Sequence, residues 1–359
     1  MQLLANIGCI DISKVERDGG DGVVTRLGKA VSKLPLGVRY AKMFLVAAQA
    51  GVLDYAILVV AIFSETSPFS SSSSTESSEE DSGLGDDQDL DDIDKNLVAE
   101  KEKKKKQSRW YHHGGDILAA MLAVGACTYA GRGAGGASEA FASRKFCEEN
   151  GLNYAIMCRI QKMRRHLAII AKNRLGTTAG VAAKTGGFSY KMKPPNKLEE
   201  TLLIQSIASG LLDHVALLAT PGDYPVDLRS AYIGCSSSIK VPLLLDKASL
   251  VYSRDYRQLP RWVCYDSIVR KIAKDGTPVN VMKNITPIDP TLLGEIAKET
   301  QMVVLGGPLP SPPPIYDVEE DAIFCSVRTK YGSHGWEISP IRRGMYETLN
   351  CHNRKETSD

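Results

Sequence analysis

Two glycine-rich stretches are the first places where this sequence could bind a phosphate group. Gly131 to Gly136 (GRGAGG) has the GxGxxG spacing of dinucleotide-binding loops, and Gly176 to Thr185 (GTTAGVAAKT) ends in Lys-Thr as a phosphate-binding loop does. A dinucleotide loop must follow a strand, whereas a helical pattern precedes Gly131. Ala183 stands where a phosphate-binding loop needs glycine. We therefore expect loops without a nucleotide at both places.

Motifs for other chemistry are absent from the sequence. It contains no GxxxxGK[ST] segment, no Asp-Glu-Ala-His segment and no arginine-rich sensor motif for NTP hydrolysis. The eight cysteines include no CxxC pair and lie at no metal-ligand spacing to histidine, so we expect neither a zinc site nor a disulfide scaffold. His112 and His113 are interpreted as surface or core residues. We predict no catalytic residue, no cofactor-binding residue and no metal ligand in this chain.

Basic side chains are the remaining candidates for a binding site. Residues 154–172 predict one helix whose inner face carries Ile156, Ile160, Met163, Leu167 and Ile170. The cations of its other face are Arg159, Lys162, Arg164, Arg165, His166, Lys172 and Arg174. Such a face is a solvated surface or a phosphate-binding surface. The net charge of +2 combines a net of −6 between residues 64 and 109 with a net of +8 in the rest of the chain. This mildly basic remainder is compatible with a polyanionic partner and with an ordinary soluble surface, so charge does not decide between the two interpretations.

The N-terminal part predicts a small helical module. Thr25 is placed to cap a short helix that Pro35 closes, and two further helical patterns run from Val38 to Gly51 and from Leu53 to Ile62. A glycine-rich hairpin at residues 18–22 precedes them. These features favour a module of the helix-turn-helix or winged-helix type. Residues 1–12 suit the last turns of a helix that glycine stops, so the chain is expected to begin inside a domain.

Residues 70–109 form a low-complexity segment. A serine tract and an acidic run precede lysines 101–106, which only Glu102 interrupts. We predict disorder, because few apolar residues are available to offset the entropy of ordering. The segment is either a solvated linker or carries kinase sites, a nuclear-import signal or an RNA tether. The sequence has no apolar run long enough for a bilayer and no signal peptide, so an intracellular protein without a membrane partner is expected.

The second half predicts helices followed by short strands. We expect helices at residues 116–129 and 198–218 and a turn at residues 147–150. After Gly222 come strand-like runs at 232–233, 240–245, 250–252, 262–269 and 279–285, separated by turn residues. Their spacing is typical of a small antiparallel barrel. The fold class predicted is therefore α+β and multidomain, with a long disordered insertion.

Several groups of residues in one order carry a resemblance. They are Thr25 to Gly28, Leu34 to Leu36, Arg39 to Met43, Leu53 to Ala56, Ser67 to Phe69, Gly115 to Leu118, Phe146 to Asn150 and Leu259 to Tyr265. The chain resembles the C-terminal region of DEAH-box ATP-dependent RNA helicases and is most similar to their nucleolar, ribosome-biogenesis branch. One departure is Asp246 to Ser249, where relatives carry His-Pro-Ser-Ser. Because of this departure, the resemblance implies an RNA contact by that turn only at Ser249, and only weakly there.

The resemblance implies a domain plan. It gives a truncated winged-helix domain (1–69), a disordered linker (70–110), a helical ratchet or helicase-associated domain (111–220), an OB-fold (221–347) and a tail (348–359). Residues 285–297 resemble the helix that plugs the OB-fold, and residues 324–336 resemble its closing strands. Trp262 is expected at the centre of the barrel, where Trp262 and Tyr265 are either core residues or base-stacking residues.

The resemblance also implies a function. The chain would be the RNA-gripping and activator-docking part of a helicase of small-subunit ribosome assembly in the nucleolus, and the RNA would be pre-rRNA or small nucleolar RNA. ATP and magnesium would bind the motor domains, so this chain alone would be inactive. The RNA contacts expected are Arg164 and Arg165 on the ratchet and Lys240, Arg254 and Arg257 on barrel loops. Alternatives are a non-enzymatic RNA- or protein-binding adaptor and a motorless product without an independent role.

Overall fold

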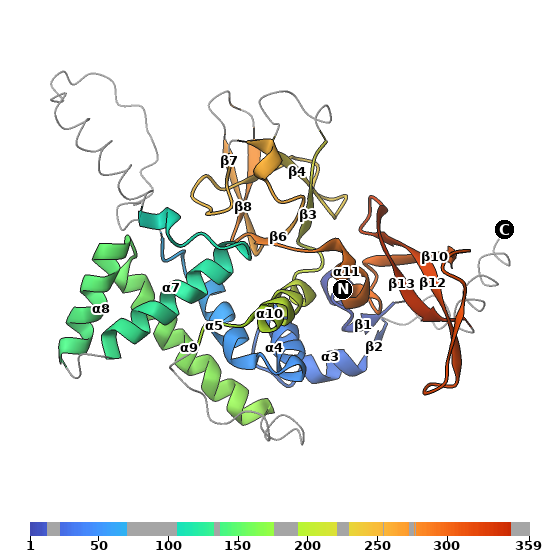
Figure 1. The fold of residues 1–359 in the computed structure, drawn as a ribbon, viewed down its shortest axis with the longest axis horizontal. Coiled ribbons are helices and arrows are strands. Elements are labelled where there is room, and N and C mark those ends of the chain that lie inside the picture. The colour runs from blue at the N-terminus through green and yellow to red at the C-terminus, as the bar shows by residue number, and fades with distance from the viewer. Residues whose placement is uncertain are drawn as a thin grey trace.

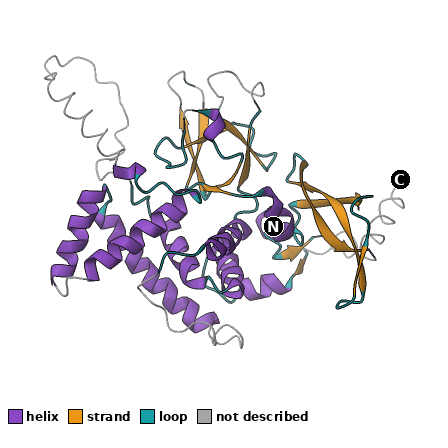
Figure 2. Ribbon diagram, in the orientation of Figure 1, coloured by secondary structure: helices purple, strands orange, loops and turns teal. Residues whose placement is uncertain are grey.

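The computed structural model describes residues 1–12, 22–69, 106–132, 137–175, 193–220, 230–253, 255–272, 276 and 278–345. Most helices lie together on one side of the molecule, and the four-stranded and seven-stranded β-sheets lie on the other (Figures 1 and 2). This is the mixed α+β class that the sequence predicts. Residues 70–105 of the predicted linker, both glycine-rich stretches apart from the end of one helix at Gly131 and Arg132, and the tail lie outside the described residues. Residues 106–110, predicted as the end of the disordered linker, are described: they begin with a helical turn, and Trp110 packs against the core of the helical bundle.

The first elements form a short hairpin between two small helices. They are α1 (Gln2–Asn6), β1 (Ile10–Asp11), β2 (Val23–Val24) and α3 (Arg26–Val31). Gly8 follows α1 with φ of 83°, a conformation that favours glycine. Thr25 caps α3: its hydroxyl oxygen accepts a hydrogen bond from the Gly28 N–H at 3.0 Å and donates one to the Gly8 carbonyl at 2.8 Å. The predicted cap is confirmed, and it also fixes α3 against the end of α1.

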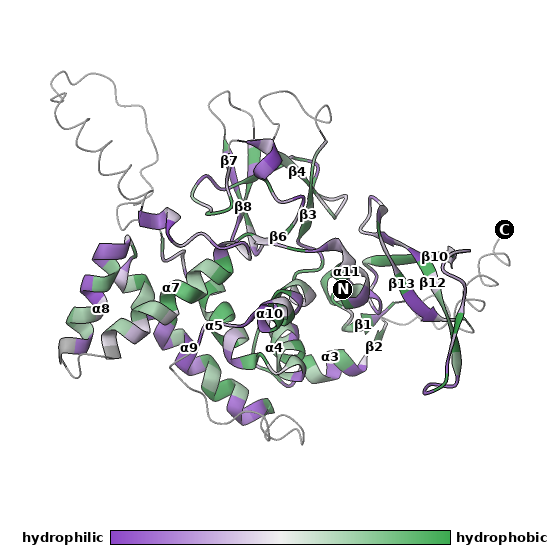
Figure 3. Ribbon diagram, in the orientation of Figure 1, coloured by the Kyte–Doolittle hydropathy of each residue, from purple (hydrophilic) through white to green (hydrophobic). Residues whose placement is uncertain are grey.

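A bundle of longer helices contains most of the core. They are α4 (Val38–Ala50), α5 (Leu53–Phe63), α7 (Gly115–Arg132), α8 (Ala137–Asn150), α9 (Tyr154–Leu175) and α10 (Lys197–Gly210). Helix α5 is the central helix: all residues from Ala56 to Phe63 are buried, because α4, α7, α9 and α10 surround it. Figure 3 shows α5 and much of α7 as hydrophobic, whereas α8 and α9 carry hydrophilic residues at intervals.

Two predicted boundaries in this bundle are wrong. Residues 147–150 form the last turn of α8, not a separate turn, and the helix ends at Gly151, whose φ is 69°. The helix predicted for 198–218 stops at Gly210, and Val215–Leu218 is strand β3. A Cβ atom at Gly210 would lie 2.6 Å from the Arg39 carbonyl oxygen, so α10 and α4 approach each other through a glycine. The chain then turns into the sheet, where β4 and β6 supply the hydrogen bonds of β3.

The first sheet has seven strands in the order β7-β8-β5-β4-β3-β6-β9. The further bounds are β4 (Ala231–Gly234), β5 (Leu243–Leu245), β6 (Trp262–Cys264), β7 (Ser267–Ile272), β8 (Pro278–Lys283) and β9 (Thr286–Pro287). Only Tyr265 and Asp266 separate β6 from β7, although these strands lie near opposite ends of the order. The sheet must therefore curl until its ends approach each other, as in a barrel. Residues 250–252, predicted as a strand, form a turn and an irregular segment.

A second, four-stranded sheet is built from the C-terminal segment. Strand β12 (Ala322–Tyr331) pairs with β10 (Val303–Pro308), β11 (Ile315–Asp317) and β13 (Trp336–Gly344). The residues predicted to close the barrel thus belong to a separate sheet. Helix α11 (Pro290–Ala297) packs on α10 and β13, and its Leu293 and Ala297 join the core of the helical bundle. It does not plug the seven-stranded sheet, whose interior is filled by side chains such as Tyr232, Val263 and Tyr265.

Trp262 also lies elsewhere than predicted. Successive strand residues face opposite sides of a sheet, so Val263 points into the curled sheet whereas Trp262 and Cys264 join the core of the helical bundle. The Trp262 ring meets the Trp336 ring of β13 edge to face, with centroids 5.3 Å apart. Trp262 therefore lies where the helical bundle, the seven-stranded sheet and the four-stranded sheet meet. Among the described helices, none is both long and apolar enough to cross a lipid bilayer.

Candidate nucleic-acid interface

Helix α9 presents a row of cations to solvent. Its apolar side, which includes Ile156, Ile160 and Leu167, is buried. The exposed basic side chains of the helix are Arg159, Lys162, Arg165, His166, Lys172 and Arg174. Lys162 and Lys172 form no ion pair within the described residues. This side of α9 is therefore able to neutralise phosphates, as predicted for a phosphate-binding helix face.

Arg164 does not belong to this exposed row. It is 5% exposed and lies on the side of α9 that carries Ile160 and Leu167, as its spacing of four and three residues from them requires. Burial raises the pKa of Asp54 on α5, and the positive charge of Arg164 opposes that rise. Arg164 thus compensates a carboxylate inside the bundle. The structure therefore corrects the prediction that it contacts RNA: its guanidinium is not available at the surface.

Arg165 has the position that the prediction requires. Its side chain is exposed, and its Nε donates a hydrogen bond to the Gln161 carbonyl one turn earlier at 3.3 Å. It lines a cleft of about 540 Å³ between α7, α8 and α9. Arg159, one and a half turns away, is held by Glu65 at 2.7 Å. Arg165 is therefore more available to a phosphate than Arg159.

The predicted barrel cations do not join the α9 row. Lys240 is exposed in the loop between β4 and β5, and Arg257 is exposed on the short 3₁₀ helix η2 (Tyr256–Gln258). Arg254 lies outside the described residues. Helix η2 lies at the end of the seven-stranded sheet that points away from the helical bundle, whereas α9 lies beyond the opposite end (Figure 1). Of the predicted barrel cations, Arg257 therefore lies on a different part of the molecule from the α9 row.

Trp262 and Tyr265 are core residues. Trp262 is 7% exposed and Tyr265 is fully buried. The Tyr265 ring stacks on His214, with centroids 5.0 Å apart. Of the two interpretations that the sequence left open, the core interpretation is confirmed for both aromatic residues.

Asp116, at the first turn of α7, joins the helices to the seven-stranded sheet. Its carboxylate accepts hydrogen bonds from the Ser249 hydroxyl at 2.8 and 2.9 Å, from the Leu250 N–H at 2.8 Å and from the Ile285 N–H at 3.0 Å. The Asp116 N–H donates to the Ile285 carbonyl at 2.8 Å. We call these contacts the Asp116 junction. Ser249, the residue for which the sequence left a weak expectation of RNA contact, is engaged inside the protein.

Gly115 makes the Asp116 junction possible. Its φ is 85°, and a Cβ atom there would lie 2.3 Å from the Ile285 carbonyl oxygen. No other residue could therefore adopt this backbone without moving α7 away from the sheet. The Gly-Asp pair before a helical pattern was the only sequence signal for this contact.

A second junction joins α4 to the same sheet. Arg39 binds the carboxylate of Asp213 through both Nη1 and Nη2, and Nη2 lies 2.8 Å from Oδ2 of Asp213 and 3.1 Å from Nε2 of His214. Burial and the nearby Arg39 charge lower the pKa of His214, so the ring is neutral. Its Nδ1 then donates to the Asp266 carbonyl at 2.9 Å while Nε2 accepts from Arg39. Burial alone would raise the pKa of Asp213, but the hydrogen bond and charge of Arg39 lower it.

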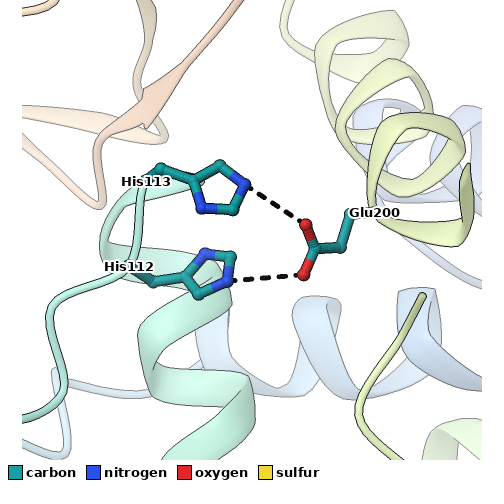
Figure 4. A group of neighbouring side chains, drawn as sticks. All are labelled: His112, His113 and Glu200. Atoms are coloured by element: carbon teal, nitrogen blue, oxygen red, sulfur yellow. Dashed lines mark ion pairs between the residues drawn. The ribbon is translucent and has the colours of Figure 1, made fainter. Parts of the chain in front are cut away.

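One group of side chains in the described residues has the composition of a metal site. His112 and His113 point toward the two carboxylate oxygens of Glu200, at 3.4 and 3.2 Å (Figure 4). The Gly114 N–H, however, donates to Nδ1 of His112 at 3.0 Å, which puts the proton of the neutral ring on Nε2. A metal at Nε2 would move that proton to Nδ1, where it would face the Gly114 N–H. The geometry therefore suits two contacts between the imidazole rings and the Glu200 carboxylate, which hold α10 beside the start of α7.

Comparison with known proteins agrees with the helical bundle. Residues 38–120 match the helicase associated domain (HA2), ratchet-like. This match begins inside the segment assigned to the winged helix, and the predicted division of the chain at residues 69 and 110 stays a prediction. The matched part of the structure thus includes α4, α5 and the first residues of α7.

Relatives extend the similarity to nearly the whole chain. The probable ATP-dependent RNA helicase DHX37 of Homo sapiens is 28% identical over 326 residues, which cover 89% of this chain and 24% of that protein. The probable ATP-dependent RNA helicase kurz of Drosophila melanogaster is 26% identical, over 92% of this chain and 26% of that protein. The probable ATP-dependent RNA helicase DHR1 of Saccharomyces cerevisiae is 23% identical, over 99% of this chain and 30% of that protein.

The chain thus spans about a quarter of the length of the curated relatives it matches. Their similarity runs through the helical bundle and both sheets. Together with the ratchet-like match, it shows that this chain corresponds to the C-terminal region of DEAH-box RNA helicases.

Proposed function

We propose that this chain is the RNA-gripping and activator-docking part of a DEAH-box ATP-dependent RNA helicase that acts in small-subunit ribosome assembly in the nucleolus. The observation that carries the RNA-gripping role is the exposed row of cations on α9, within a region related to RNA helicases. The RNA would be pre-rRNA or a small nucleolar RNA. The activator would be a ribosome-assembly protein, and the motor domains would supply the ATP and magnesium chemistry.

The α9 row would hold RNA through its phosphates. Lys162 and Lys172 are ten positions apart, which is about 15 Å along a helix at 1.5 Å per residue. Arg165 lies between them on the exposed side. A row of this length offers charges to several consecutive phosphates and has no group that faces a base edge in a fixed direction. Binding should therefore be independent of base sequence and sensitive to salt.

The test is the salt dependence of single-stranded RNA binding by the full chain. Each lost phosphate contact should reduce the slope of log K against log salt by about 0.7. The variant R165A/K172A should therefore bind more weakly and with a slope smaller by about 1.4. A matched control is K298A/K330A, which removes two exposed cations from α11 and β12. Equal losses in the two variants would remove α9 from the RNA site and leave only an effect of net charge.

A non-enzymatic adaptor is the second candidate, because the sequence carries no phosphate-binding loop. The adaptor would bind RNA or protein without motor domains. Mixing the purified chain with a separately expressed motor fragment from a related helicase distinguishes the candidates. A helicase part should raise RNA-stimulated ATP hydrolysis by the motor fragment, whereas an adaptor should leave it unchanged.

A further inference from the structure

Two cysteine thiols meet between α7 and α8. The Sγ atoms of Cys127 and Cys147 lie 3.5 Å apart. Cys127 is 6% exposed and Cys147 is fully buried. The sequence gives no sign of this pair, because the two residues are twenty positions apart and belong to no cysteine motif. Formation of a disulfide requires the two sulfurs to approach by only about 1.5 Å, to the bond length of about 2.05 Å.

The hydrogen bonds of the pair give the two thiols different roles. Cys127 lies 3.9 Å from the Ser143 carbonyl oxygen and can donate its proton to that acceptor. In the hydrogen bond between the two sulfurs, the Cys147 thiol is then the donor and the Cys127 sulfur is the acceptor. This hydrogen bond lowers the pKa of Cys127 and raises the pKa of Cys147. Cys127 is consequently the better nucleophile of the two.

The same cleft that Arg165 lines gives access to only one of these thiols. Its wall includes Cys127 and the exposed Cys158, whereas Cys147 is not part of it. With a volume of about 540 Å³, the cleft admits a small molecule. A reagent in the cleft can thus reach Cys127 first, and Cys147 stands directly behind it.

We propose that Cys127 and Cys147 form a reversible oxidation site for hydroperoxides, in which Cys127 is oxidised first and Cys147 then forms a disulfide with it. The Cys127 thiolate attacks one peroxide oxygen, the O–O bond breaks, and a sulfenic acid forms at Cys127 with release of water after proton transfer. The Cys147 sulfur then attacks the sulfur of that sulfenic acid, the S–O bond breaks, and a second water leaves. Two thiols and one hydrogen peroxide thus give one disulfide and two waters.

The site is tested on the full chain by exposing the reduced protein to hydrogen peroxide. The protein is then denatured, its remaining thiols are alkylated, and the digest is analysed by mass spectrometry. The expected product is a peptide pair linked through Cys127 and Cys147, lighter by about 2 Da than the two reduced peptides and restored by dithiothreitol. Because this measurement uses the unchanged protein, it does not depend on the folding of a variant.

Two variants separate the roles of the cysteines. In C147A, Cys127 should accumulate as a sulfenic acid that dimedone traps, because the resolving thiol is gone. In C158A, the Cys127–Cys147 link should form at an unchanged rate. Circular dichroism confirms that each variant is folded. The proposal is overturned if Cys127 and Cys147 remain free thiols under conditions that oxidise Cys158, or if the main product links Cys127 to Cys158.

Discussion

Replacement of Asp116 by alanine should separate the helical bundle from the seven-stranded sheet. The change removes the acceptor for the Leu250 and Ile285 N–H groups and for the Ser249 hydroxyl. Ile285 is fully buried and Leu250 is partly buried, so at least one N–H loses its partner without access to water. An unpaired buried donor costs about 1–3 kcal/mol, and loss of a carboxylate from the first turn of α7 costs about 0.3–1 kcal/mol. We expect the free energy of unfolding to fall by roughly 1–4 kcal/mol.

Two measurements check this expectation. Urea unfolding followed by tryptophan fluorescence gives the loss of stability. Amide hydrogen exchange gives its location, because protection of the Leu250 and Ile285 amides should fall more than protection of amides in α5. The variant D116N tests the role of the two acceptor oxygens. Its side-chain amide replaces one oxygen with an NH2 group, which faces a donor and cannot accept its hydrogen bond, so D116N should be destabilising as well.

The matched control is Asp289, which caps the short helix α11 by accepting one hydrogen bond from the Thr291 N–H at 2.9 Å. Its replacement by alanine should cost about 1 kcal/mol, the usual value for a cap, and should leave the amides at the Asp116 junction protected. Equal losses for D116A and D289A, or unchanged exchange at Leu250 and Ile285, would refute the account of the Asp116 junction.

Arg164 and Arg165 are adjacent but should respond in opposite ways. Arg164→Ala should lower the free energy of unfolding by about 1–3 kcal/mol, because the half-buried Asp54 carboxylate, whose Oδ1 is buried, loses the opposing charge. Arg165→Ala should change the free energy of unfolding by less than about 0.5 kcal/mol and should weaken RNA binding. Urea unfolding and RNA titration of both variants check this, and equal stability losses would contradict it. Lys42 is 4% exposed and donates to the Ile7 carbonyl at 2.7 Å, and burial lowers its pKa to about 8. Between this pKa and the pKa of about 10.5 that Lys42 has in the unfolded chain, the Lys42 amine is protonated only in the unfolded chain. The free energy of unfolding therefore rises with pH in this range, by up to about 1.4 kcal/mol per pH unit. Lys42→Met should lack this rise, and a constant difference between the unfolding free energies of wild type and variant from about pH 8 to 10 would contradict the assignment.

The local elements could be predicted from sequence because their signals are local. The Thr25 cap, the helices from Val38 and Leu53 and the strand at Val279 follow from residues within a few positions of each other. The errors occurred where a distant contact decides the outcome. Helix α10 ends at Gly210 because α4 passes close to it, and no residue near position 210 in the sequence reports that contact.

The candidate RNA site shows the same division. The periodicity of α9 placed Arg165 and Lys172 on its exposed side, but it also placed Arg164 there, because three neighbouring basic positions look alike in a pattern of charges. The spacing of Arg164 from Ile160 and Leu167 puts it on the buried side, where the positive charge of Arg164 acts on Asp54 of the neighbouring helix. Similarly, strand alternation could not show which side of β6 faces the interior of the sheet, so Trp262 was placed in the wrong core.

The residues that carried the resemblance have a common role that is structural. Arg39 contacts Asp213, Asp116 contacts Ser249, and the Tyr55 hydroxyl donates to the Lys193 carbonyl at 3.0 Å. Each of these contacts spans more than a hundred positions of the chain. The resemblance therefore reported how the helical bundle and the curled sheet are fixed to each other. The residues that it assigns to the RNA surface stay predictions, apart from Arg164, which is buried. A ratchet helix can transmit force to bound RNA only if its own support does not move, so the two junctions are as necessary to the proposed grip as the cations of α9.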